Sequence, residues 1–148
     1  MMENLNRHAT ARSLPIALLR ARERVMGPIR GMLSDVGITE QQWRVLRVLQ
    51  EAGPQDPTTI ADSACLLLPS LTRILQKLEE KNLITRTADK VDRRKQVVSI
   101  APAGSALIAE NLGRSIALLD GLRTRMGAED YDRLLDLLNA LNEVQFSE

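Results

Sequence analysis

The sequence predicts a mostly α-helical protein that carries one small β-hairpin. Apolar residues recur at spacings of three and four along most of the 148 residues, which places them on one face of a helix. Aromatic residues make up only 2% of the chain, and this composition disfavours a β-sandwich or barrel. Two short segments rich in β-branched residues, 83–87 and 96–100, flank a charged stretch and predict the hairpin.

Length and composition limit the class of protein further. A chain of 148 residues fits one domain, residues 1–148, with enough apolar residues for a core. No apolar run approaches the ~20 residues that span a bilayer, and residues 1–13 lack the apolar centre of a signal peptide, so we expect a cytoplasmic protein. Cys65 and His8 are the only cysteine and histidine, which predicts no disulfide, zinc site or other cofactor.

The charge is distributed unevenly although the net charge is only +1. Residues 69–95 contain eight basic and four acidic side chains. A basic segment in a nearly neutral chain predicts a local site for a polyanion rather than a generally cationic protein.

The first long helix is expected from Leu14 to Val36. Ser13 can cap its start, Gly27-Pro28 should kink it, and the chain from 1 to 12 is either a frayed end or an arm that touches phosphate through Arg7 and Arg12. Its apolar stripe has little to pack against within the chain, so we expect a partner chain to cover it. The stripe consists of Leu14, Leu18, Ala21, Val25, Ile29, Met32 and Val36.

A second helix is predicted to begin at a capping box formed by residues 39–42 and to end near Gly53. It carries Trp43, the single tryptophan. A tryptophan on an apolar helix face packs in a core, but Trp43 could also form the wall of a ligand pocket. A short helix follows over 58–64, and Cys65 stands in the apolar run 64–68, which predicts a buried, unreactive thiol rather than a redox sensor.

The helix that begins at Pro69 and the hairpin that follows it form the predicted DNA-binding unit. The apolar side chains of this helix, Leu71, Ile74, Leu75 and Leu78, fall at i, i+3, i+4 and i+7. With the helix over 58–64 it forms a helix-turn-helix pair, in which the second helix enters the major groove. The outward residues predicted to bind DNA are Ser70, Thr72, Arg73, Gln76 and Lys77.

Arg73 suits a bidentate contact to guanine and Gln76 one to adenine. The alternative is that this face is only solvated, but the cationic hairpin that follows directly favours DNA. Its tip could straddle the DNA backbone with one arginine in the minor groove. The tip residues predicted to bind DNA are Lys90, Asp92, Arg93, Arg94 and Lys95.

Two further helices are expected after the hairpin, one from Pro102 to a stop at Gly127 and one from Ala128. The first has apolar residues that alternate four and three apart, as in a coiled coil. Such long seams predict a helical dimer interface, and the alternative is packing within one chain. The seam consists of Ile108, Leu112, Ser115, Leu119, Leu122 and Met126, and the last helix has Tyr131, Leu134, Leu138 and Leu141 on one face.

The pattern LxxLExKxLITRxxxxxDRRxxxVxI over 75–100, followed by Pro-Ala-Gly, resembles the winged helix-turn-helix of MarR-type transcriptional regulators. The Asp-x-Arg motif of that family is matched at 92–94, while Ile100-Ala101 replaces its usual Leu-Thr pair. Segments 37–46 and 68–75 are similar to the subgroup that represses homoprotocatechuate degradation operons. The resemblance extends from Leu14 to Leu141.

This resemblance implies a homodimer in which residues 13–36 and 102–146 form the dimerisation region and residues 39–101 the winged helix-turn-helix. It implies that Arg94 is the minor-groove arginine, with Asp92 holding its guanidinium or the turn. Two recognition helices related by a two-fold axis would read palindromic double-stranded DNA with half-sites roughly 34–36 Å apart.

The resemblance further implies a repressor of an aromatic-compound degradation operon, released by a small aromatic carboxylate. That effector would lie between the first two helices and the fifth, with Arg20, Arg24 and Trp43 as the candidate ligand-binding residues. The sequence has no phosphate loop, metal cluster or nucleophile with a base, so we expect no enzyme activity. The alternative function is an architectural or helical interaction protein without a ligand response.

Overall fold

The computed structural model describes residues 9–146, so the predictions for Arg7 and His8 fall outside the described residues. Helices dominate, with one antiparallel hairpin, which confirms the predicted fold class. No helix within residues 9–146 is long and apolar enough to cross a membrane. In order, the elements are η1 (Thr10–Arg12), α2 (Leu14–Asp35), α3 (Glu40–Ala52), α4 (Pro57–Ser63), α5 (Leu68–Glu80), β1 (Ile84–Ala88), β2 (Gln96–Ile100), α6 (Pro102–Met126) and α7 (Ala128–Asn142).

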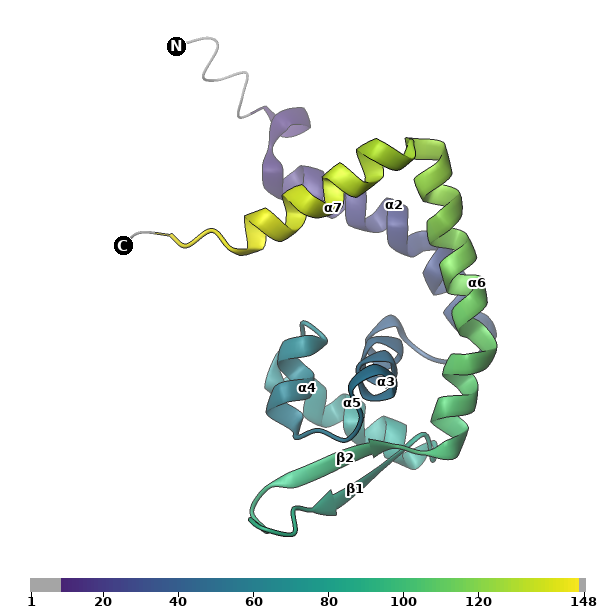
Figure 1. The fold of residues 1–148 in the computed structure, drawn as a ribbon, viewed down its shortest axis with the longest axis vertical. Helices are drawn as coiled ribbons and strands as arrows, with labels where there is room; N and C mark the ends of the chain where they lie inside the picture. The colour runs from purple at the N-terminus through teal and green to yellow at the C-terminus, as the bar shows by residue number, and fades with distance from the viewer. Residues whose placement is uncertain (1–8, 147–148) are drawn as a thin grey trace.

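The elements from α3 to β2 pack together at one end of the molecule, and we call residues 39–101 the head (Figure 1). Helix α6 runs from the head along one side, and α7 turns back from its far end. We call α2, α6 and α7 the outer helices. The stop signals are where the sequence places them, since Gly37, Gly53 and Gly127 all have positive φ, a conformation that glycine adopts without strain.

The hydrophobic core lies mainly in the head and in the halves of α2 and α6 that touch it. By contrast, α7 has no buried residue, and leucines at the start of α2 are exposed, Leu14 by 54% and Leu18 by 40%. The predicted stripe of α2 is therefore buried in its second half only. The most deeply buried side chains are Met32, Leu33, Val45, Leu46, Leu49, Ile60, Leu71, Leu75, Leu78, Ile84, Val98 and Ile108.

The hairpin is fixed to the rest of the head at two places. Its strands pair from Ile84 opposite Ile100 to Ala88 opposite Gln96, and Val98 also exchanges two backbone hydrogen bonds with Gln55 in the turn between α3 and α4. At the base of the hairpin, α6 starts directly against the Leu83 carbonyl. A β-carbon on Gly104 would collide with that oxygen, which explains the glycine in the first turn of α6.

The prediction that Cys65 is buried is wrong. Cys65 is exposed and has φ 55° in the turn that joins α4 to α5. This left-handed residue reverses the chain, so that Ala64 and Leu66 pack against the core while the thiol between them lies at the surface. The apolar character of the run 64–68 therefore gave a misleading signal, because Leu67 is 76% exposed as well.

Candidate nucleic-acid interface and effector groove

The inner side of α5 determines which of its residues face outward. Leu71, Leu75 and Leu78 are at most 1% exposed, so the helix cannot rotate without exposing them to water. The opposite side is accessible along its whole length. It presents all five of the predicted recognition residues, Ser70, Thr72, Arg73, Gln76 and Lys77.

Four of these five side chains form no hydrogen bond with any residue in the range 9–146, and the exception is Thr72. Its Oγ1 donates to the Leu68 carbonyl at 3.2 Å, so its proton is used inside the helix. Arg73 and Gln76 keep every polar atom available. Their geometry is compatible with the bidentate base contacts that these residue types make in the major groove.

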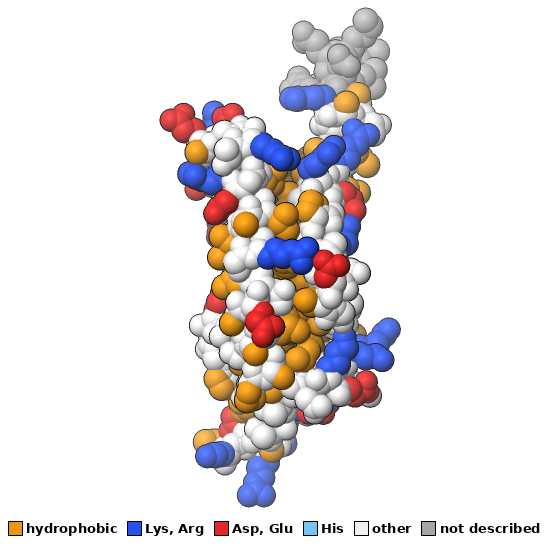
Figure 2. Space-filling model, turned by 90° about the vertical axis from the view of Figure 1, so that its right-hand side faces the viewer, with side chains coloured by type: hydrophobic (Ala, Val, Ile, Leu, Met, Phe, Trp, Pro, Cys, Tyr) orange, Lys and Arg blue, Asp and Glu red, His pale blue; other side chains and the backbone are white. Residues whose placement is uncertain are grey.

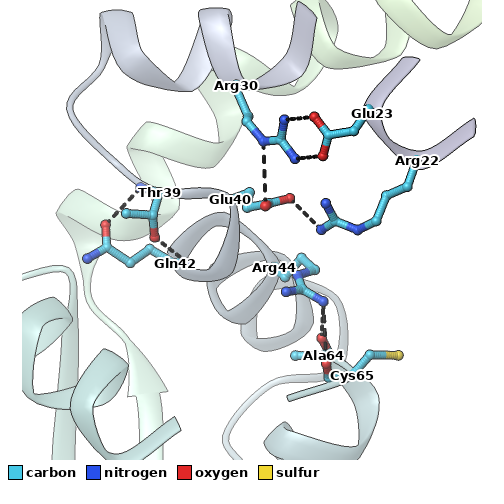
Figure 3. A network of polar contacts seen from close by, with 9 residues as sticks. All are labelled: Arg22, Glu23, Arg30, Thr39, Glu40, Gln42, Arg44, Ala64 and Cys65. Carbon is cyan, nitrogen blue, oxygen red and sulfur yellow. Dashed lines mark hydrogen bonds and ion pairs between the residues drawn. The ribbon is translucent and has the colours of Figure 1, made fainter. Parts of the chain in front are cut away.

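The turn before α5 is held from α3 by Arg44. Its Nη1 donates to the carbonyl oxygens of Ala64 at 2.9 Å and Cys65 at 3.4 Å (Figure 3). These carbonyls lie at the end of α4, where backbone acceptors have no partner within the helix. Arg44 therefore fixes the angle between α4 and α5, the two helices of the helix-turn-helix.

The hairpin tip is organised by two aspartates. Asp89 Oδ1 accepts the backbone N–H groups of Asp92 at 3.0 Å and Val91 at 2.8 Å, and these two bonds hold the pKa of Asp89 below its usual value. Asp92 Oδ1 accepts from the backbone N of Arg94 at 3.1 Å and from its Nε at 3.2 Å. Asp92 thus restrains both the turn and the Arg94 guanidinium, as expected.

The remaining cations of the tip point into solvent. The Arg94 side chain is 92% exposed, so its terminal nitrogens stay accessible while Asp92 restrains Nε. Lys90, Arg93 and Lys95 are exposed and form no side-chain ion pair with the part of the chain that the structure describes. This arrangement presents four positive charges at the end of a narrow hairpin, which suits a phosphate backbone.

Two of the eight basic residues in 69–95 hold the head together instead. Arg86 on β1 forms a bidentate pair with Glu79 on α5, with Nη2–Oε1 2.9 Å and Nε–Oε2 3.2 Å, and this guanidinium lowers the pKa of Glu79. Lys81 Nζ donates to the Gly37 carbonyl at 3.0 Å. Six cations therefore remain for a polyanion, and we call them the reading cations: Arg73, Lys77, Lys90, Arg93, Arg94 and Lys95.

A second cluster of charges lies where α2 meets the start of α3 (Figure 3). Glu40 accepts a hydrogen bond from Arg22 Nη2 at 2.8 Å, and its other oxygen lies 3.6 Å from Arg30 Nε. Arg30 in turn forms a bidentate pair with Glu23, at 2.7 and 2.8 Å. That pair lowers the pKa of Glu23 and raises the pKa of Arg30. We call these four residues the junction cluster.

A groove of about 1010 Å³ runs between α2 and α6. Figure 2 shows it as a hollow in which hydrophobic side chains lie between two ridges. Its lining includes both predicted effector arginines, Arg20 and Arg24, together with Arg125, which the sequence gave no reason to select. Apolar residues supply much of the rest, namely Leu19, Val25, Pro28, Ile29, Ala117, Leu118, Leu119 and Leu122.

Trp43 does not line this groove. It is 7% exposed and belongs to the hydrophobic core, which agrees with the core interpretation of this residue. Besides Arg125, sequence reasoning missed the roles of Glu40 and Arg44. The capping box that contains Glu40 was visible, but its arginine partners on α2 lie 18 and 10 residues earlier, a separation at which periodicity gives no pairing signal.

Residues 38–96 match the MarR family. The chain is 35% identical to the HTH-type transcriptional regulator FarR of Neisseria gonorrhoeae, over 97% of both chains. It is 43% identical to the homoprotocatechuate degradative operon repressor of Escherichia coli over 95 residues, 64% of each chain. The crystal structure of NadR in complex with 4-hydroxyphenylacetate superimposes with a TM-score of 0.76 and 35% identity, covering 88% of this chain and 92% of that one.

Proposed function

The chain belongs to the MarR family of transcriptional regulators, and we propose that it represses an operon for the degradation of an aromatic compound. In this proposal it binds a palindromic operator as a homodimer and leaves the operator when a small aromatic acid binds. Membership of this family makes the protein a regulator and not an enzyme. The observation that carries the proposal is the set of six reading cations, of which two lie on the polar face of α5 and four at the hairpin tip.

DNA binding would combine two kinds of contact. We call the hairpin of β1 and β2 the wing. Its tip cations Lys90, Arg93, Arg94 and Lys95 would contact phosphates, with Arg94 in the minor groove, and Asp92 would keep Arg94 in place. On α5, Arg73 and Gln76 would read base edges, while Ser70, Thr72 and Lys77 would contact the backbone or a base edge. Phosphate contacts supply affinity, and the base contacts supply specificity.

A second copy of the chain would cover the apolar surface that the outer helices leave open. Leu19 is 62% exposed, Ile116 47% and Leu137 57%, and large apolar side chains exposed together on neighbouring helices are typical of an interaction surface. The dimerisation region would be residues 13–36 and 102–146. A two-fold axis there would place the two α5 helices roughly 34–36 Å apart, on successive turns of the major groove.

The effector would bind in the groove between α2 and α6, which is lined by the half of α6 that lies away from the head. Arg20 and Arg24 would pair with its carboxylate, and the leucines of the lining would cover its ring. The likeness to a homoprotocatechuate degradative operon repressor and to a NadR complex with 4-hydroxyphenylacetate supports this ligand class. Trp43 lies outside the groove in a single chain, and its contribution to an effector site stays a prediction.

Release from DNA would follow from a shift between two arrangements of the dimer. The effector would favour the arrangement in which the recognition helices are wrongly spaced for the operator. It can act only through its different affinity for the two arrangements, and the operator must weaken effector binding by the same factor.

The test is fluorescence anisotropy of the purified protein on the DNA upstream of its own gene, against random duplex at physiological salt. Hydroxyphenylacetates and benzoates are then added one at a time. Specific binding that one of these acids abolishes supports the complete proposal, and specific binding that none of them affects removes the effector class. Equal affinity for both duplexes favours an architectural DNA-binding protein, and no binding to either contradicts the DNA-reading surface.

A further inference from the structure

The head meets α2 at the junction cluster, and one carboxylate forms the centre of this contact. Glu40 is the first residue of α3, and its side chain is only 12% exposed. The two arginines that approach it both come from α2 and lie eight residues apart, about two helical turns. Glu40 therefore ties the start of the head to two separate turns of one outer helix (Figure 3).

The same end of α3 is connected to the recognition helix. Thr39 and Gln42 form a reciprocal capping box, with both bonds at 3.1 Å. Lys81, the residue that follows α5, donates from Nζ to the Gly37 carbonyl at 3.0 Å and to Gln42 Oε1 at 3.4 Å. The end of the recognition helix is thus fastened to the turn that leads into α3 and to the first turn of α3, where Glu40 lies.

The cluster also borders the proposed effector groove. Glu23 lines that groove and at the same time holds Arg30 in a bidentate pair, while Arg30 reaches Glu40. Groove lining, α2, the start of α3 and the end of α5 are therefore joined by contacts of 2.7 to 3.6 Å. A displacement of Glu23 in the groove would therefore change the contact between Arg30 and Glu40, and with it the orientation of the head relative to α2.

We propose that Glu40 is a positioning residue that sets the angle of the head against α2, and through it the distance between the two recognition helices of a dimer. This inference rests on the proposed function, because the distance matters only for a dimer on a two-fold operator. The Glu40 carboxylate supplies a charge that two guanidinium groups share, and a neutral amide of the same shape cannot hold both of them.

The consequence is a test that needs no knowledge of the effector. Adding one base pair at the centre of the operator moves the half-sites apart by about 3.4 Å and rotates them around the duplex. A dimer with a fixed head angle should discriminate strongly between the two spacings. A dimer with a loosened head should accept both.

The experiment starts from a duplex enriched on the wild-type protein from a random library, and from its variant with one added central base pair. The measured quantity is the ratio of the two dissociation constants. We expect Glu40→Gln to lower that ratio by about tenfold, a size typical of the coupling between linked sites. Arg22→Ala should lower it by a smaller factor, because Arg30 still contacts Glu40. The double variant should do no more than Glu40→Gln alone, because the Arg22 contact is already lost in that variant.

The matched control is Asp35→Asn, which likewise turns a carboxylate into an amide, here at the end of α2. Asp35 pairs with Arg114 on α6 at 3.0 Å, and both side chains are more than half exposed. This variant loses an ion pair of similar length without touching the head, so its ratio should equal that of the wild type. Affinity for random duplex shows in each case that the head is folded.

The possible outcomes separate the inference from the proposed function. A wild-type preference for one spacing that Glu40→Gln and Arg22→Ala both retain overturns the inference alone. A wild-type protein without any preferred duplex overturns the proposed function and the inference together. If Glu40→Gln misfolds and no longer binds random duplex, the same ratio is measured for Arg22→Lys. Arg22 is more exposed than Glu40, and lysine keeps the positive charge while losing the planar guanidinium that fits a carboxylate. A ratio equal to that of the wild type then overturns the inference.

Discussion

The reading cations and the cations of the junction cluster are the same residue types in opposite situations. Arg73 and Arg93 have no ion-pair partner among residues 9–146, and Arg94 is restrained only at Nε. Arg22 and Arg30 are paired with carboxylates at 2.8 and 2.7 Å. The unpaired group can neutralise an external polyanion, whereas the paired group has used its charge to fix one element against another.

A count of basic residues does not distinguish cations that bind DNA from cations that position one helix against another. Ion pairs near the surface contribute about 0–1 kcal/mol to stability, so the junction cluster is not a large stabilising feature. Its contribution is to geometry. Substitutions of reading cations should therefore lower the affinity for DNA and leave the arrangement of helices intact. Substitutions in the junction cluster should change the arrangement of helices, and with it the preference for one operator spacing.

The largest expected effect is the loss of operator binding when Arg73 and Arg94 are both replaced by alanine. Each contact is worth about 1–3 kcal/mol, so the double variant should bind at least about 30-fold more weakly. Fluorescence anisotropy on the operator measures the loss. The control is Arg114→Ala, which removes an exposed arginine that pairs with Asp35 on the outer helices. Unchanged affinity in the double variant would refute the DNA-reading assignment.

The two single variants distinguish base contacts from phosphate contacts, because the first change sequence preference and the second change the salt dependence of binding. Arg73→Ala should relax the preference at one base-pair position, whereas Arg94→Ala should weaken binding to all sequences and reduce the salt slope by about 1. If Arg94→Ala leaves the slope unchanged, Arg94 does not neutralise a phosphate.

The effector groove offers the next test, with Arg20→Ala plus Arg24→Ala. Losing charge-assisted hydrogen bonds of about 1.5–3 kcal/mol should raise the effector concentration for half-release by about tenfold or more. Operator affinity without effector should stay the same, because neither arginine belongs to the reading surface. Titration of the effector into the protein–operator complex measures both quantities. A parallel Arg133→Ala variant, an exposed arginine on α7 outside the groove lining, should release normally.

A smaller effect is expected for the pair that joins α5 to the wing. The Arg86 guanidinium lowers the pKa of Glu79 below its ordinary value of 4.5. A lowered pKa in the folded state stabilises the fold above pH 4.5 and loses that contribution as the pH falls through the lowered value. The melting temperature of Arg86→Ala should therefore lie below that of the wild type at pH 6, and the difference should vanish in acid. A difference that persists below the lowered pKa would assign the effect to packing.

The sequence predicted what local patterns encode. Spacing along α5 identified Leu71 and Leu75 as its buried side, glycines marked the helix ends, and the β-branched segments gave the hairpin. The exposed cations of the wing followed from composition alone, because a segment so rich in charge cannot be buried.

The pairing of distant residues could not be predicted in this way. Arg86 and Arg93 look alike in the sequence, and only the fold shows that Glu79 holds the first. Glu40 gave a capping signal but no sign of its arginine partners, since these come from a different helix. Arg125 joins the groove only because α6 lies along α2.

The smallest effect is expected for a substitution of Cys65, which lies between the residues that hold the fold together and those predicted to contact DNA. Its carbonyl accepts from Arg44 and so takes part in holding the turn before α5, but its thiol lies at the surface. The backbone contact does not depend on the side chain, so Cys65→Ser should change operator affinity by less than about twofold, within the range typical of surface substitutions.

The native thiol should react with Ellman's reagent at one equivalent per chain without prior unfolding. A thiol that reacts only in denaturant would restore the buried interpretation that the apolar neighbours suggested. A serine variant with strongly weakened binding would place the side chain itself in the DNA-reading surface, alongside the exposed Leu67.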